Sequence, residues 1–331
     1  MVNNAVQMIP ILQMSMFKPY QFLFVAACMV LPGVACAVAI DPDGVGLDPA
    51  IGARGMNWTA GNTLITPVGG ASIFAHPVGD VFQSYTHASL HEFGGSSGVN
   101  IGGRWTFVAG YREQVVSTLG NNVVLDTIGG GDNFFRLYFD ATPNANSGNG
   151  TGYGPPDITN PDPVLILSGT INASTGQTAI SAFNVGPDSL DKSGVDNYPV
   201  VDSITAVGDG TLAAIIESFD PAYFPEGLPI GFGLDFQITF SVPFSQTDPS
   251  SCFKNGAGAL INGVGPNTLD GLECSVNTVG NINGIDGTNL ILMTDASALF
   301  TQVTTVPEPM PLALLGVGLV AMGTGKWRRK G

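Results

Sequence analysis

The sequence FGLDFQITFSV, residues 232–242, carries the clearest structural signal in this chain of 331 residues. Every second residue from Leu234 to Val242 is large and apolar. A period of two places these side chains on one face of an extended strand, whereas a helix needs apolar residues three and four apart. The segment therefore predicts a β-strand with one buried face.

Similar strand patterns occur along most of the chain. They cover Asp80–Leu90, Gly103–Leu119, Asn133–Asp140, Pro163–Ile171, Val200–Val207 and Thr288–Phe300. Thr211–Phe219 fits either one helix or one more strand. The chain also contains 45 Gly and 23 Pro, which argue against a helical bundle. We therefore predict an all-β fold, an antiparallel β-sandwich that is jelly-roll-like.

Residues 40–305 are predicted to form this domain. Thr142–Pro163 is rich in Asn, Gly and Pro, so we expect a long surface loop. The Asn-Gly and Gly-Asn pairs of the Asn255–Gly287 loop predict turns and small hairpins. A domain boundary near residue 150 is an alternative, but the similar composition of both halves favours one sandwich.

The charge balance excludes one class of partner. Residues 40–305 contain six basic and 25 acidic residues, a net charge of −19. Nucleic-acid binding needs Lys and Arg to neutralise phosphates, so we expect no nucleic-acid partner.

The first 39 residues are typical of a secretory signal peptide. Lys18 precedes an apolar run from Phe22 to Ala39, and small residues offer cleavage sites after Ala37 and after Ala39. Signal peptidase is therefore an expected partner. An uncleaved membrane anchor is the alternative, because the apolar run approaches the length of a membrane span.

The last 26 residues, 306–331, combine three features in order. Val306 and the Pro307-Glu308-Pro309 motif precede an apolar run from Met310 to Gly325. A basic tail follows, made of Lys326, Arg328, Arg329 and Lys330. The apolar run predicts a short transmembrane helix, and the basic residues are typical of its cytoplasmic end.

This order resembles the PEP-CTERM sorting signal of Gram-negative bacteria. The resemblance implies that a membrane protease-transpeptidase, exosortase, recognises Pro307, Glu308 and Pro309 as parts of a substrate. It also implies an inner-membrane intermediate, and then export to the cell surface or to an exopolysaccharide matrix.

Short segments of the domain resemble flocculation-associated PEP-CTERM proteins. They are Asp41-Pro42-Asp43-Gly44, Trp58 with Gly61-Asn62, Pro243-Phe244, Asp248-Pro249-Ser250, Ile282-Asn283-Gly284, Thr294-Asp295-Ala296 and Phe300. This second resemblance implies a role in holding cells and exopolysaccharide together in flocs or biofilm, and it implies no enzymatic activity.

Two cysteines, Cys252 and Cys274, remain once the signal peptide is removed. An even number of cysteines in an oxidising compartment predicts a disulfide between them. Two free thiols are the alternative.

Oxygen-rich turns suggest weak calcium binding as the one cofactor to consider. Asp41, Asp43 and Asp48 lie in one turn-forming segment, and Gly129–Asp132 is a fragment of a calcium-binding repeat. The alternative is that these aspartates are solvated turn residues.

The remaining motifs give little support for catalysis. His87 and His91 lie four residues apart beside Glu92, but no third metal ligand is evident, so we expect surface strand residues. Gly94-Gly95-Ser96-Ser97-Gly98 fits the G-x-S-x-G pattern, but a strand-like run follows it where a hydrolase needs a helix.

We therefore expect a structural or adhesive protein rather than an enzyme. A carbohydrate-binding module is the first alternative, with aromatic residues stacking on sugar rings. The candidates for stacking are Trp58, Trp105, Tyr153 and Tyr223, of which Trp105 also fits a core position. A secreted hydrolase with paired carboxylates from distant strands is the second alternative.

Overall fold

The computed structural model describes residues 37–46, 50–69, 77–94, 103–156, 161–229, 231–261, 268–269, 272–273 and 279–302. Within these residues the chain is all-β and has no α-helix, which confirms the all-β part of the predicted fold. Nearly all strand pairings are antiparallel, whereas residues 202–203 pair with residues 282–283 in parallel. The described part of the chain contains no helix that is long and apolar enough to cross a membrane.

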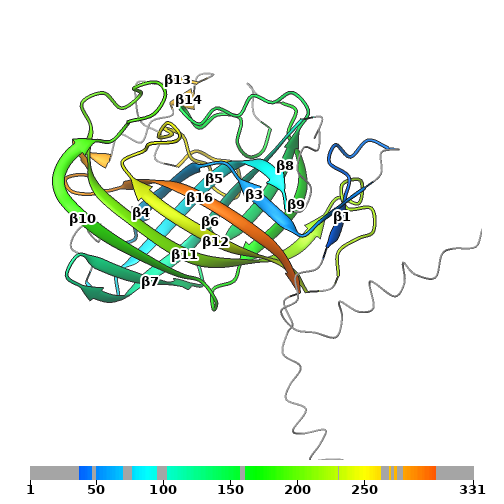
Figure 1. Ribbon diagram of the computed structural model, residues 1–331, viewed down its shortest axis with the longest axis horizontal. Coiled ribbons are helices and arrows are strands. Elements are labelled where there is room, and N and C mark those ends of the chain that lie inside the picture. The colour runs from blue at the N-terminus through cyan, green and yellow to red at the C-terminus, as the bar shows by residue number, and fades with distance from the viewer. Residues whose placement is uncertain are drawn as a thin grey trace, which may run out of the picture.

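The described residues form sixteen strands, and most of them lie in one large sheet (Figure 1). In chain order they are β1 (Val38–Ile40), β2 (Ile51–Ala53), β3 (Gly55–Trp58), β4 (Gly61–Pro67), β5 (Val81–Phe93), β6 (Arg104–Leu119), β7 (Asn122–Ile128), β8 (Phe134–Asp140), β9 (Val164–Ile171), β10 (Gln177–Ser189), β11 (Asp202–Phe219), β12 (Phe232–Val242), β13 (Thr268–Leu269), β14 (Leu272–Glu273), β15 (Ile282–Asn283) and β16 (Leu290–Gln302).

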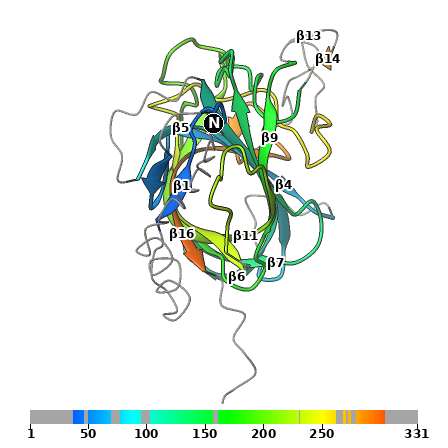
Figure 2. The same ribbon diagram turned by 90° about the vertical axis from the view of Figure 1, so that its right-hand side faces the viewer.

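The main sheet closes on itself. Around the closure, β5 pairs with β6, followed by β8, β9, β11, β12 and β16, and both β3 and β4 join β16 back to β5. β7 and β10 form a second connection between β6 and β11. Figure 2 shows the strands wrapped around a common interior. This closure gives the sheet one inner face and one outer face.

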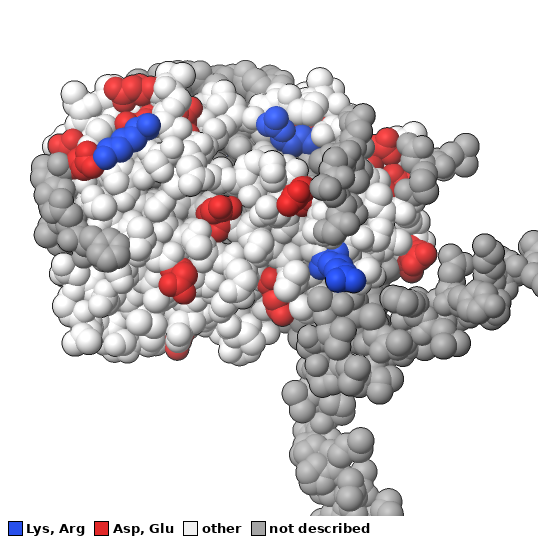
Figure 3. All heavy atoms as spheres, viewed as in Figure 1, with Lys and Arg blue, Asp and Glu red and all other residues white. Residues whose placement is uncertain are grey.

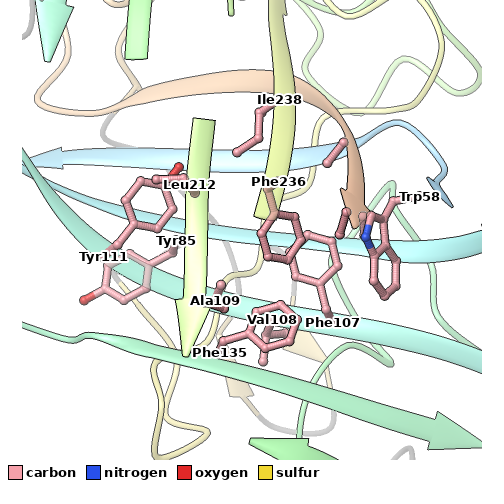
Figure 4. Packing of buried hydrophobic residues seen from close by; sticks show 14 of the residues in the cluster. Trp58, Tyr85, Phe107, Val108, Ala109, Tyr111, Phe135, Leu212, Phe236 and Ile238 are labelled. Carbon is pink, nitrogen blue, oxygen red and sulfur yellow. The ribbon is translucent and has the colours of Figure 1, made fainter. Parts of the chain in front are cut away.

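The inner face forms an aromatic core (Figure 4). Phe236 on β12 lies 5.5 Å from Phe135 on β8 and 6.2 Å from Phe107 on β6, measured between ring centroids. Trp58 packs edge-on against Phe107 at 4.7 Å. A cavity lined by these core side chains measures about 20 Å³, which is room for little more than a water molecule.

Burial along β12 follows the predicted alternation. From Leu234 to Val242 the even-numbered residues are buried, whereas Asp235, Gln237 and Thr239 are exposed. Thr211–Phe219 is part of the long strand β11, so the strand alternative is correct and the helix alternative is wrong.

Strand β5 departs from simple alternation, because both of its faces are buried from Phe82 to Leu90. Loops cover the outer face of β5, and this covering creates the buried polar cluster described below. The expected loop from Asn255 to Gly287 contains the three short strands β13, β14 and β15.

Candidate functional site

The predicted calcium residues lie in a tight turn after β1. Asp41 Oδ1 accepts a hydrogen bond from the backbone N–H of Gly44 (3.1 Å), and Asp43 Oδ1 accepts one from Val45 (3.0 Å). Burial, together with the neighbouring Asp43 carboxyl, raises the pKa of Asp41. Backbone donors therefore already occupy one oxygen of each carboxylate.

This turn offers two carboxylates for a cation, and Asp48 lies outside the described residues. In the described part of the chain, no group of three or more His, Cys, Asp or Glu side chains is arranged to hold a metal ion. The Asp132 carboxylate of the Gly-rich turn accepts a hydrogen bond from the hydroxyl of Tyr85 (3.0 Å). Calcium binding by Asp41 and Asp43 stays a prediction.

His87 is buried, so the prediction of a surface residue was wrong. Its side chain is 2% exposed, and its Nε2 lies 2.9 Å from the hydroxyl of Ser250. The imidazole stacks on Tyr153 with 4.2 Å between ring centroids. Burial, with a smaller contribution from the positive charge of Lys254, lowers the pKa of His87 to about 3. His91 is exposed, as expected.

The pair of His87 and Ser250 is structural rather than catalytic. The Ser250 hydroxyl donates to the carbonyl oxygen of Ser147, so its remaining lone pairs accept the Nε2–H of a neutral imidazole. A nucleophilic serine would instead give its proton to the histidine. Ser250 is also fully buried, so no substrate reaches it. Ser96 of the G-x-S-x-G pattern lies outside the described residues.

Two sequence motifs meet beside this pair. Asn62 of the Gly61-Asn62 motif accepts the backbone N–H of Ser250 (2.8 Å) and donates to the carbonyl oxygen of Asp248 (3.2 Å). Gly61 has no space for a side chain, because a Cβ atom there would lie 2.3 Å from the carbonyl oxygen of His87. The Asp248-Pro249-Ser250 motif is therefore fastened to the sheet by Asn62 and His87.

A third motif also fastens a loop. The buried amide of Asn283 makes two hydrogen bonds to the backbone of Ile291, at 2.8 and 2.9 Å, and so holds β15 against β16. Buried amides that replace backbone partners fix chain geometry strongly, because an unpaired amide in the interior is costly. These motifs therefore hold loops and short strands against the main sheet.

No protein-family model, no curated protein and no solved structure matches this chain.

The four aromatic residues considered for sugar stacking are all buried. Trp58, Trp105, Tyr153 and Tyr223 are between 0 and 6% exposed, so none can present a ring face to a sugar. Trp105 Nε1–H donates to the carbonyl oxygen of Pro42 (2.7 Å), which ties the N-terminal turn to the core. Trp105 is therefore a core residue, as the alternative interpretation had it, and the other three aromatic residues are core residues too.

Glu113 is a buried carboxyl that the sequence did not single out. It is 3% exposed, its Oε2 accepts a hydrogen bond from Ser84 (3.0 Å), and its Oε1 has no hydrogen-bond partner. Burial raises the pKa of Glu113, and the nearby hydroxyls of Thr178 and Ser84 offset only part of this effect. The carboxyl is sealed from solvent, which gives it a role in the interior rather than in binding.

The outer face of the sheet carries a polar groove. A groove of about 250 Å³ lies on β3, β11, β12 and β16. Its lining side chains are polar or acidic at Asn57, Asp209, Gln237, Thr239, Asp295 and Ser297. Figure 3 shows acidic groups dispersed over a mostly uncharged face with few basic groups. The sequence contains no local signal for this groove, because its residues come from four separate strands.

Several predicted site residues lie outside the described part of the chain. They are Pro307, Glu308, Pro309, Lys326, Arg328, Arg329 and Lys330, together with most of the signal peptide and Cys274. Cys252 is buried and disulfide-bonded. Its pairing with Cys274 stays a prediction.

Proposed function

We propose that this chain is an exported PEP-CTERM protein that exosortase sorts to the cell surface or to the exopolysaccharide matrix. There it serves a structural or adhesive role in flocculation or biofilm and catalyses no reaction. The single observation that carries the proposal is the order of Pro307-Glu308-Pro309, a short apolar run and a basic tail at the end of the chain.

The position of β1 distinguishes between the two candidate signal-peptide cleavage sites. Strand β1 begins at Val38 and pairs with β2, so cleavage after Ala39 would remove two residues of a paired strand. Cleavage after Ala37 leaves the strand complete. We therefore favour Ala37 as the last residue of the signal peptide.

The domain architecture supports a passive scaffold. We infer a jelly-roll-like sandwich, because aromatic side chains of β6 and β8 pack against Phe236 of β12 across the interior. Three side chains of types that often act in catalysis are buried and make hydrogen bonds, namely His87, Ser250 and Glu113. The outer face carries dispersed acidic groups, which suit contact with a hydrated matrix (Figure 3). Ca²⁺ would bridge these groups to acidic polymers.

Settling of the culture tests the proposal. The gene is deleted in its host and restored with either the full chain or a chain lacking residues 307–331, and the protein is then located in membrane, surface and matrix fractions. We expect lost settling, rescue by the full chain, and retention of the truncated form away from the matrix. Unchanged settling after deletion would overturn the adhesive role, and normal matrix placement of the truncated chain would overturn sorting.

A carbohydrate-binding module is the second candidate function, and the groove on the outer sheet favours it. The aromatic residues first considered for stacking are buried, so any such binding depends on polar side chains.

A further inference from the structure

Seven adjacent strands contribute one polar side chain each to a single row across the outer face. The pairings run from β7 through β10, β11, β12, β16 and β3 to β5. In this order the directly opposed residues are Asp126, Gln177, Thr211, Gln237, Ser297, Asn57 and Glu92. Each residue is the register partner of the next, so the row is continuous.

The row is long and stands on a firm base. Neighbouring strands lie about 4.8 Å apart, so seven strands span about 29 Å. Directly beneath the row, Leu212, Phe236 and Ala298 point inward and are buried in the core. Packing of these inner residues fixes the strands, so the backbone positions that carry the outer polar side chains are held at set spacings.

The centre of the row has unused hydrogen-bonding capacity. Within the described residues, the side chains of Thr211, Gln237, Ser297 and Asn57 make no hydrogen bond to the protein. The buried amide of Asn283, in contrast, bonds the backbone through both its nitrogen and its oxygen. The row therefore offers two free amides and two free hydroxyls to a ligand from outside.

The groove lies over this centre and defines the chemistry of the ligand. Asp209 and Asp295 flank Thr239 in the neighbouring register row, two strands apart, which separates their backbones by about 10 Å. The lining residues include two carboxylates and no basic side chain. An anionic polymer would be repelled here, whereas carboxylates and amides suit the many hydroxyl groups of a neutral sugar chain.

We propose that this row, with the groove at its centre, binds a neutral, hydroxyl-rich polysaccharide laid across the strands. A volume of about 250 Å³ is below that of a pocket for a drug-sized molecule, about 300 Å³ or more. The groove therefore holds one or two rings of a chain whose remaining rings follow the row. This proposal rests on the proposed function, because it names the polymer class that the exported domain contacts.

Affinity electrophoresis of the purified full-length protein tests the site. Native gels contain no polymer, galactomannan as a neutral chain, or alginate as an anionic chain with and without Ca²⁺. The test variant is the double substitution Asn57→Ala and Gln237→Ala. The matched control is Thr170→Ala with Glu217→Gln, two changes on β9 and β11 away from the groove, and thermal unfolding verifies that every variant remains folded.

We expect galactomannan to retard the wild type and alginate without Ca²⁺ to leave it unretarded. Loss of two amide contacts is expected to weaken binding about tenfold, whereas the control variant keeps wild-type retardation. No retardation by galactomannan would overturn the proposal, and so would equal loss in the control variant. Sedimentation that shows the wild type as a dimer, lost in the test variant, would assign the row to a second copy and also overturn it.

This test is independent of sorting. Binding is measured on purified protein, so a failed settling experiment with intact retardation contradicts the proposed function alone. Normal matrix placement with no retardation by the polymer contradicts the binding row alone.

Discussion

Replacing His87 by glutamine tests whether one buried, neutral imidazole makes the fold sensitive to acid. The pKa of His87 is about 3 in the folded protein, against 6.5 for an ordinary histidine. Between these two values the unfolded chain binds a proton that the native chain excludes. Stability is therefore fully present above pH 6.5 and is lost as the pH falls towards 3.

The size of this effect follows from the two pKa values. Over the steep part of the window the free energy of unfolding falls by about 1.4 kcal/mol for each pH unit. Between pH 7 and pH 4 the total loss from this residue is about 3 kcal/mol. That loss is a large fraction of the stability of a typical domain, which is about 5–15 kcal/mol.

The measurement is urea unfolding, followed by tryptophan fluorescence, at several pH values from 4 to 7. His87→Gln retains an amide donor near Ser250 but cannot titrate, and the loss of stacking on Tyr153 lowers its stability at every pH. We expect the stability difference between wild type and variant to shrink by about 3 kcal/mol from pH 7 to pH 4. His91→Gln, at an exposed position of β5, is the control and should follow the wild type. Parallel pH profiles of wild type and His87→Gln would refute this reasoning.

Three further predictions concern the interior and the first turn. Phe236→Ala should lower the free energy of unfolding by about 3–5 kcal/mol in denaturant titrations, because it leaves a cavity between the facing aromatic rings. Glu113→Gln should stabilise the protein at pH 7 but not at pH 4. Burial raises the pKa of the Glu113 carboxyl, so the wild type loses stability as the pH rises above 4.5, whereas the glutamine variant does not. Equal gains at both pH values would contradict this. Gly44→Ala should lower stability by about 1–3 kcal/mol, seen as a lower Tm, because φ is +67° and the new Cβ would lie 2.6 Å from the Tyr223 ring. An unchanged Tm would show that the turn can relax.

The sequence predicted strands well where one face is buried and the other is open. β12 is the clearest case, since its exposed residues alternate with a continuous apolar face. β10 gave no such signal, because register shifts after Ala182 and after Asn184 interrupt the alternation along the strand. β5 was located correctly, but the burial of its outer face depends on loops that no local pattern describes.

The functional surfaces were harder to predict for the same reason. His87 is buried because Ser250, 163 residues away in the sequence, covers it. The polar row depends on the register of seven strands, and a shift of one residue in any strand would turn that side chain inward. Nothing in the sequence around Asn57 or Gln237 indicates that both lie in one row. Their common row is seen only in the strand register, where each is paired with Ser297.

Strand β16, the last long strand of the described chain, lies inside the sheet rather than at an edge. It is paired with β12 along a continuous register from Met293 to Gln302, and on its other side with β3 and β4. A pull on the chain beyond Gln302 acts along the axis of this central strand. Shear then loads all of the flanking hydrogen bonds at once, whereas a strand peeled from an edge would break them one at a time. If the chain is held through its C-terminus, as the proposed sorting implies, tension would load these hydrogen bonds in shear.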